Sequence, residues 1–239
     1  MKTSNKILLI TLAVIFLLTA GFIITSRIFV SCEPWMEYDI ADDEEYEIGD
    51  IQAQLFDLQG FDEIEVEGNW RLKIRQADSF RVEIEAPDYL MDELHVETIG
   101  SRLRLDMPRR RIHDHKLWAN IEMPTLTRIQ SDYGSSIRFD GFEIRDLDLR
   151  TNGGSHIVGE NNSIKNLFVV TNGAAYIDLK DTETVNADLD LNGAGSVILN
   201  MAGGELTGSA NGACRIEYYG EISRRDFESS GFVSFDHHR

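Results

Sequence analysis

Apolar and polar residues alternate from Phe61 onward, which is the pattern of half-buried β-strands. Asp78-Ser79, Ala86-Pro87-Asp88 and Gly100-Ser101 supply turns between these strands, and residues 89–93 are expected to form one helical turn. The inward positions of this part are Ile64, Val66, Trp70, Leu72, Ile74, Phe80, Val82, Ile84, Leu94, Val96, Leu103, Leu105 and Met107.

A short phrase returns every 19 or 20 residues through the second half of the chain. Each copy has Asn-Gly followed by two small residues, and apolar residues recur at the same spacing five positions after each Asn. Weaker copies stand at 131–137 and 229–235. The four clear copies are Thr151-Asn152-Gly153-Gly154-Ser155-His156-Ile157, Thr171-Asn172-Gly173-Ala174-Ala175-Tyr176-Ile177, Leu191-Asn192-Gly193-Ala194-Gly195-Ser196-Val197 and Ala210-Asn211-Gly212-Ala213-Cys214-Arg215-Ile216.

Repeats of this length indicate a stack of coils in which equivalent residues lie about 4.8 Å apart. We therefore predict an all-β fold, a single-stranded parallel β-solenoid with about 19–20 residues per coil. An Asn-Gly pair also suits a two-residue hairpin, so an antiparallel meander is the alternative. Constant spacing and the small residues after each glycine favour the solenoid.

The Asn-Gly pairs are expected to form a structural ladder at one corner of the coils, because Asn and Gly both tolerate positive φ. An Asn amide at such a corner can bind its own turn or the Asn of the next coil. The small residues that follow indicate a narrow bend, in which Cys214 is a small buried thiol. The ladder consists of Asn152, Gly153, Asn172, Gly173, Asn192, Gly193, Asn211 and Gly212.

Positions that face outward from the coils are where a contact site would lie. Phe168 and Val170 are both apolar and outward in one coil, so they are the best candidates for a small contact patch. His156 and Tyr176 stand at equivalent positions of consecutive coils and would suit stacking against a sugar ring. In the last coil, Phe227, Phe232 and Phe235 are expected to plug the end of the solenoid, with His237-His238 extending beyond it.

Residues 7–26 form an uncharged, mostly apolar run of the length that spans a bilayer. Lys2 and Lys6 precede the run, which places residues 1–6 in the cytoplasm and the rest of the chain outside. An acidic linker is expected over 27–55, before a solenoid domain over 56–239. A single-pass anchor of a bacterial membrane is the favoured interpretation. A cleaved signal peptide and a lipoprotein acylated at Cys32 remain open.

The formal net charge of −18 opposes binding to nucleic acids, because phosphate contacts need clustered Lys and Arg. The basic stretch over 109–116 falls between strands and is expected to be a solvated loop. The chain contains none of the G-x-S-x-G, H-E-x-x-H, P-loop or C-x-x-C signatures. We therefore expect no enzyme activity, no metal and no cofactor.

The Asn-Gly corners and two strand motifs resemble the bacterial head GIN domain family, a group named for adhesion. The motifs are Ile64-Glu65-Val66-Glu67-Gly68, followed by Trp70, Leu72 and Ile74, and Gly100 followed by Leu103 and Leu105. The resemblance covers about residues 56–235 and implies a right-handed parallel β-solenoid behind a signal or anchor. It brings no functional residues with it.

These observations predict an envelope protein, periplasmic or extracellular, that acts as an adhesion or recognition module for a protein or a glycan. The alternative is a structural scaffold in which solenoid ends associate into a homo-oligomer, since open strand edges invite pairing. A glycan-active enzyme is the third interpretation, and the minimal coils leave no insertion long enough to build a cleft.

Overall fold

The computed structural model describes residues 50–107 and 117–238, which form fourteen strands and one short helix. The helix α2 spans Asp88–Met91 and overlaps the turn predicted over 89–93, beginning one residue earlier and ending two residues earlier. The strands are β1 (Ile51–Phe56), β2 (Glu63–Glu67), β3 (Trp70–Gln76), β4 (Arg81–Pro87), β5 (His95–Ile99), β6 (Arg102–Asp106), β7 (Leu117–Met123), β8 (Arg128–Tyr133), β9 (Ser136–Asp140), β10 (Glu143–Gly153), β11 (His156–Gly173), β12 (Tyr176–Ala202), β13 (Glu205–Glu221) and β14 (Arg224–His238).

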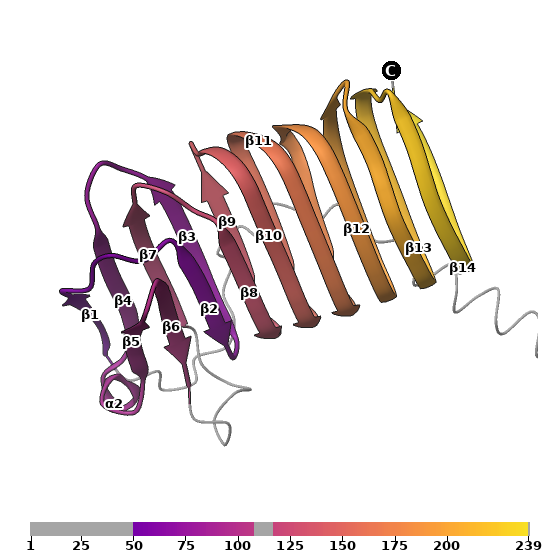
Figure 1. Ribbon diagram of the computed structural model, residues 1–239. Helices are drawn as coiled ribbons and strands as arrows, with labels where there is room; N and C mark the ends of the chain where they lie inside the picture. Colours follow the sequence, from indigo (N-terminus) through magenta and orange to yellow (C-terminus); the bar gives the residue numbers. More distant parts are fainter. Residues whose placement is uncertain (1–49, 108–116, 239) are drawn as a thin grey trace, which may run out of the picture. The chain divides into compact units, whose positions relative to one another are not determined.

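From β8 to β14 the chain winds as a parallel β-solenoid of about six turns (Figure 1). Leu149 pairs with Ile129 on one side and with Val169 on the other, so the register equals the sequence repeat. This parallel register confirms the predicted solenoid and excludes the antiparallel meander.

Each coil is flat and has two outward sides, which we name by their place relative to the Asn-Gly corner. Face A consists of the segments that lead into the corner, such as β8 and the second half of β11. Face B consists of the segments that leave it, such as β9 and the first half of β11. Every coil therefore contributes one strand segment to each face.

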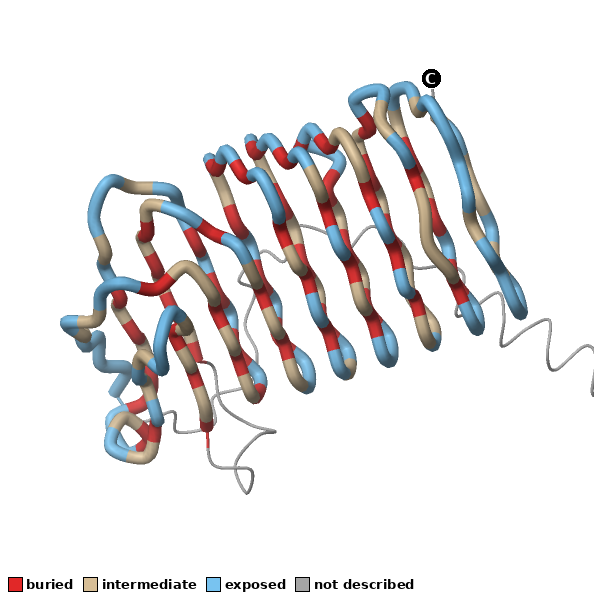
Figure 2. Tube along the Cα trace, viewed as in Figure 1, coloured by how far each residue is buried: buried red, intermediate tan, exposed pale blue. Residues whose placement is uncertain are grey.

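The core lies between the two faces and is built from the predicted inward positions. Ile157, Ile177 and Ile216 are fully buried, and Val197 is 1% exposed. Figure 2 shows buried residues alternating with more exposed ones along the coils up to β13, whereas β14 has no buried residue. Burying a side chain of this size stabilises the fold by about 1.5–3 kcal/mol, so the stacked apolar columns are the main source of cohesion between coils.

The N-terminal strands do not stack in sequence order. β2 pairs with β6 on one side and β8 on the other, and β3 lies between β7 and β9. The coil formed by β2 and β3 is thus placed between two later coils. On the far side of this region β4, β1 and β5 add antiparallel pairs. The alternation of apolar and polar residues predicted these strands but did not predict which of them pair with one another.

Strand β1 begins inside the segment predicted as linker. Ile51 to Phe56 pair with β4, so the folded domain starts before residue 56. Ile51, Ala53 and Leu55 supply the alternation that makes this a strand. The predicted cytoplasmic tip over 1–6, the membrane segment over 7–26, the acidic linker up to residue 49 and the basic loop over 109–116 lie outside the described residues.

A helix long and apolar enough to cross a membrane does not occur within 50–107 or 117–238.

The last coil differs from the predicted plug of three phenylalanines. Phe227 and Phe235 pack edge to face at 5.0 Å, but Phe232 is 78% exposed because it takes an outward position opposite Ala213. His237 and His238 belong to β14 and stack on Tyr218 and Tyr219, so the prediction that they extend beyond the fold is wrong.

Candidate binding surfaces

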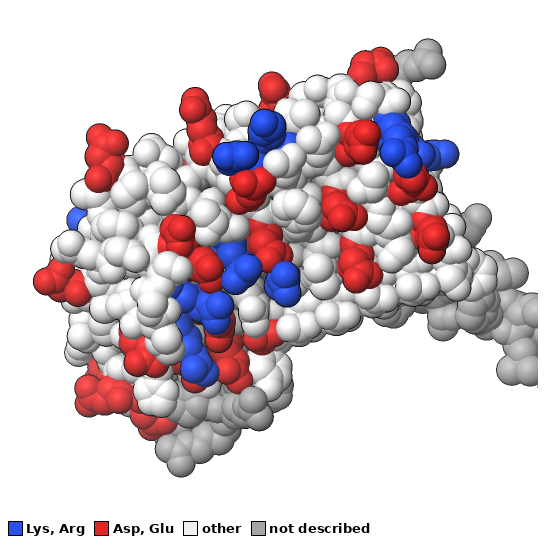
Figure 3. Space-filling view, viewed as in Figure 1, with Lys and Arg blue, Asp and Glu red and all other residues white. Residues whose placement is uncertain are grey.

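Alternating charges cover the N-terminal part of face A. Adjacent strands bring Arg102, Glu63, Arg128 and Asp148 into one row, with N–O distances of 3.2, 3.1 and 3.1 Å between successive partners. The pKa of Arg102 is raised, chiefly by its hydrogen bond with Glu63. Exposed pairs of this kind contribute at most about 1 kcal/mol each. Their effect here is a surface whose charges are locally neutralised (Figure 3).

Phe168 and Val170 interrupt this row of charges in the next coil. Phe168 lies between Asp148 and Asp188 of the neighbouring coils and is 44% exposed. Val170 stands two residues along the same strand and is half-buried. An aromatic side chain left this exposed on a polar face provides apolar area that a partner can bury.

Acidic residues follow on the far side of Phe168. Asp190 accepts hydrogen bonds from the Asn192 amide at 2.9 Å and the Ser209 hydroxyl at 3.4 Å. Neither Asp188 nor Asp190 has a basic partner within 4.0 Å in the part of the chain that the structure describes. The apolar pair therefore borders carboxylates whose charge is not neutralised.

The rings of His156 and Tyr176 contact one another on face B, with centroids 5.0 Å apart and planes tilted by 52°. The Tyr176 hydroxyl donates to Asp178 at 3.4 Å. Burial lowers the pKa of His156, while the charge of Asp178 opposes this and that of Arg138 adds to it. The imidazole is accordingly neutral at pH 7, and the two rings present a small aromatic surface.

The two candidate contact sites, Phe168 with Val170 and His156 with Tyr176, lie on different faces. His156 pairs with Ser136 on face B, whereas Phe168 pairs with Asp148 on face A. The chain passes from one face to the other between them, within β11. The sequence therefore points to two separate candidate surfaces on opposite sides of the same region.

The structure places the Asn-Gly pairs in register at one corner of the coils. The Asn172 amide donates to Asn152 at 3.1 Å, Asn152 donates to Asp132 at 2.6 Å and Asn211 donates to Asn192 at 3.4 Å. Asn192 departs from this series, since its amide donates to Asp190. The glycines of the corner, Gly153, Gly173, Gly193 and Gly212, have φ of +131°, +132°, +124° and +123°.

A second amide ladder lies at the opposite end of face A, and the sequence reasoning missed it. Asn166 donates to Asp146 at 2.7 Å, and Asn186 donates to Asn166 at 3.0 Å. The side-chain amide oxygen of Asn186 then accepts from the backbone N–H of Glu205 at 3.0 Å. The signal was present, because Asp146, Asn166 and Asn186 are spaced by 20 residues.

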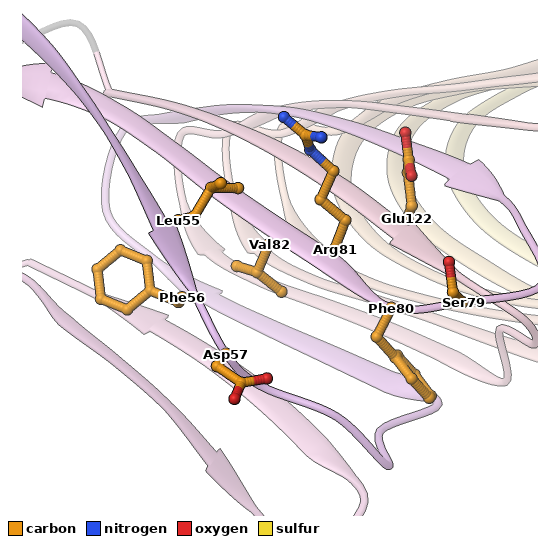
Figure 4. A pocket seen from close by; sticks show the side chains of 8 residues that line it. All are labelled: Leu55, Phe56, Asp57, Ser79, Phe80, Arg81, Val82 and Glu122. Atoms are coloured by element: carbon orange, nitrogen blue, oxygen red, sulfur yellow. The ribbon is translucent and has the colours of Figure 1, made fainter.

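A shallow hollow of about 440 Å³ lies beside the end of β1 (Figure 4). Phe56, Phe80 and Val82 line it together with the charged Arg81 and Glu122. Arg81 and Glu122 extend toward one side of the sheet, and Phe80 extends toward the other. The hollow therefore straddles an edge of the sheet and lacks the converging polar groups of a ligand pocket.

No group of three His, Cys, Asp or Glu side chains arranged to hold a metal occurs among the described residues. Cys214 is buried at the corner, as its position in the repeat predicts, and burial raises the pKa of its thiol. That shift lowers its reactivity at neutral pH.

Several solved structures share this fold. A protein described as an adhesin from Bacteroides fragilis has 14% identity and a TM-score of 0.59, over 79% of this chain and 97% of its own. A protein described as lipid-binding from Parabacteroides distasonis has 13% identity and a TM-score of 0.51, over 80% and 98%. A further adhesin-named structure from Parabacteroides merdae has 12% identity and a TM-score of 0.51, over 80% and 97%.

At these identities the likeness concerns the fold alone. No curated protein matches the chain. Residues 60–222 match the family described as "Putative auto-transporter adhesin, head GIN domain", which is most of the described chain and includes every Asn-Gly corner. The chain belongs to the head GIN domain family.

Proposed function

We propose that this protein is a non-enzymatic recognition module of the bacterial envelope that binds a partner protein through face A. The binding surface consists of Phe168 and Val170 with Asp188 and Asp190 beside them. The adhesin names of the family and of similar structures support a role in recognition. We further propose that residues 7–26 anchor the module in a membrane, with the N-terminus in the cytoplasm and the solenoid outside.

The observation that carries this proposal is the exposure of Phe168 within a row of charged residues. A side chain that is 44% exposed between two aspartates contributes little to the fold and much to a partner that covers it. The adjacent carboxylates of Asp188 and Asp190 favour a partner with Lys or Arg beside an apolar contact. The formal net charge of −18 on this chain also favours a basic partner.

A pull-down from an envelope extract of the source bacterium tests the proposal. The bait is a fragment that starts at residue 48, because the compact unit begins there and includes β1. The test variant carries Phe168→Asp and Val170→Asp. The control carries Ser136→Asp and Ser196→Asp, which add the same two charges at positions on face B, away from the proposed surface.

A partner captured by the wild type and the control but lost from the test variant supports the proposal. Equal capture by all three proteins refutes the face A site. If a glycan binds the wild type but does not bind a variant with His156→Ala and Tyr176→Ala, the binding site lies on face B.

The alternative function is a self-associating scaffold of the envelope. Its supporting observation is that none of the described strands pairs with the outer edge of β14. Filaments in sedimentation or microscopy, without any captured partner, favour this alternative over recognition.

A further inference from the structure

Strand β1 is an edge strand, and no described strand covers its outer side. It is the terminal strand of the sheet order and pairs only with β4 (Figure 1). Ile51 is 50% exposed, Leu55 is 61% exposed and Ala53 is exposed between them. These three side chains lie on the same side as Glu83 and Glu85 of β4, which is the outward side of the sheet.

The edge of β1 also lacks the features that keep edge strands apart. Its six residues, Ile-Gln-Ala-Gln-Leu-Phe, contain no charge, no proline and no glycine. By contrast β14, the edge at the other end, carries Arg224, Arg225, Asp226, Glu228 and Asp236. The short edge strand β5 carries His95 and Glu97. Only β1 among these described edges has an unprotected backbone.

The sequence of β1 is also self-complementary. Around Ala53 it reads Ile51-Gln52-Ala53-Gln54-Leu55, which has the same character in both directions. In an antiparallel pair of two copies centred on Ala53, Ile51 of one copy faces Leu55 of the other, and Gln52 faces Gln54. Each apolar side chain then meets an apolar side chain, and no like charges are opposed.

We infer that β1 pairs antiparallel with β1 of a second copy of this chain, about a twofold axis at Ala53. The interface is isologous and closes on itself, so it yields dimers and no filaments. It continues face B through β4 and β1 of both copies, in the antiparallel sense that β1 and β4 already have. The dimer is independent of the recognition role proposed for Phe168, which lies on face A.

Disulfide trapping in the full chain tests the axis. The background carries Cys32→Ser and Cys214→Ala, so that the introduced cysteine is the sole thiol. Ala53→Cys places two thiols directly opposite one another, with Cα atoms about 4.5–5.5 Å apart, which is within disulfide range. Leu55→Cys is the matched control, because its two copies are displaced by about 14 Å along the strands.

With mild oxidant, Ala53→Cys is expected to give a reducible band at twice 27.1 kDa, and Leu55→Cys is expected to stay monomeric. Combining Ile51→Cys with Leu55→Cys should restore the dimer band, since these positions face one another. Equal cross-linking of the two single variants overturns the proposed register. A cross-link from Ala53→Cys to a different polypeptide overturns the self-pairing.

Sedimentation of the full chain in mild detergent gives an independent readout. The wild type is expected at a dimeric protein mass, and Ala53→Lys is expected to be monomeric because two ammonium groups meet at the axis. Ile99→Lys puts the same charge on the edge strand β5 and should leave the dimer intact. A monomeric wild type, or dimers of Ala53→Lys, would overturn the inference.

Discussion

Asn172 donates a hydrogen bond of 3.1 Å from its side-chain amide to the side-chain oxygen of Asn152, which occupies the same corner one coil earlier. The two residues are 20 positions apart and stand in parallel register. The contact thus links coils through side chains at the point where the backbone leaves face A. Because the Asn residues recur once per coil, their side-chain amides form a row along the corner.

Replacing Asn172 by Ala is expected to lower the free energy of unfolding by about 0.5–1.5 kcal/mol, the usual value of one hydrogen bond. Asn69→Ala is the control, because Asn69 is exposed in the turn between β2 and β3. The control should change stability by less than about 0.5 kcal/mol. Denaturant titration measures both, and equal effects of the two changes would show that the amide ladder adds nothing.

Gly193→Ala is expected to be more damaging than the loss of any corner amide. A Cβ at this position would lie 2.2 Å from the carbonyl oxygen of Gly173, and φ is +124°. Gly203 also has positive φ, +88°, but a Cβ there has nothing within 4 Å. Gly203→Ala therefore carries the cost of backbone strain alone, about 1–2 kcal/mol.

The difference between the two alanine variants isolates the collision between coils. In denaturant titration, the loss in free energy of unfolding caused by Gly193→Ala should exceed that caused by Gly203→Ala by at least about 1 kcal/mol. Overpacking typically costs about 1–3 kcal/mol. Similar losses would mean that the coils separate without cost, contrary to the close stacking at this corner.

The repetitive half of the fold could be predicted because a solenoid's register is its sequence period. Ile157 and Ile177 are equivalent in the repeat, and they are paired neighbours in the structure. The N-terminal order could not be predicted in this way. Alternation shows that Ile64 and Leu103 face inward, but it does not show that their strands are adjacent. That adjacency depends on the return of the chain after β3, which no local pattern encodes.

The candidate surfaces were predicted only in part. Outward positions were assigned correctly for Phe168 and Tyr176, because alternation determines the side of a strand. That the pair Phe168 and Val170 lies on a different face from His156 and Tyr176 was not predicted, because alternation does not show which residues lie before and after a corner of the coil. The edge formed by Ile51 to Phe56 was also missed, since the acidic residues that precede it suggested a linker.

Thr184→Val is expected to stabilise the protein. The Thr184 side chain is fully buried, and its hydroxyl has no hydrogen-bond partner among the described residues. Replacing a buried unsatisfied hydroxyl by a methyl group of similar shape should raise the free energy of unfolding by about 1 kcal/mol. Thr182→Val is the matched change two residues away.

Thr182 is equally buried, but its hydroxyl accepts a hydrogen bond of 3.1 Å from the Asn162 amide. Thr182→Val should therefore destabilise by about 1–3 kcal/mol, because one N–H of the buried Asn162 amide loses its acceptor while the amide keeps its bond to the Phe139 carbonyl oxygen. In thermal and denaturant unfolding, the change in free energy of unfolding is expected to have opposite signs for Thr184→Val and Thr182→Val. The same sign for both would show that hydrogen bonding does not decide stability at these sites.

His156 should make the protein less stable as the pH falls. Burial lowers its pKa below the ordinary value of about 6.5, so the folded state binds a proton less readily than the unfolded state. The stabilising contribution of neutral His156 is complete above about pH 6.5 and declines as the pH falls toward its lowered folded-state pKa. His156→Phe keeps a ring against Tyr176 and removes the titrating group. When the pH is lowered from about 7.5 to about 5, the free energy of unfolding of His156→Phe should fall less than that of the wild type. Tyr176→Phe keeps the imidazole and should lose as much stability as the wild type does. Parallel pH profiles for His156→Phe and the wild type would show that another group causes the loss.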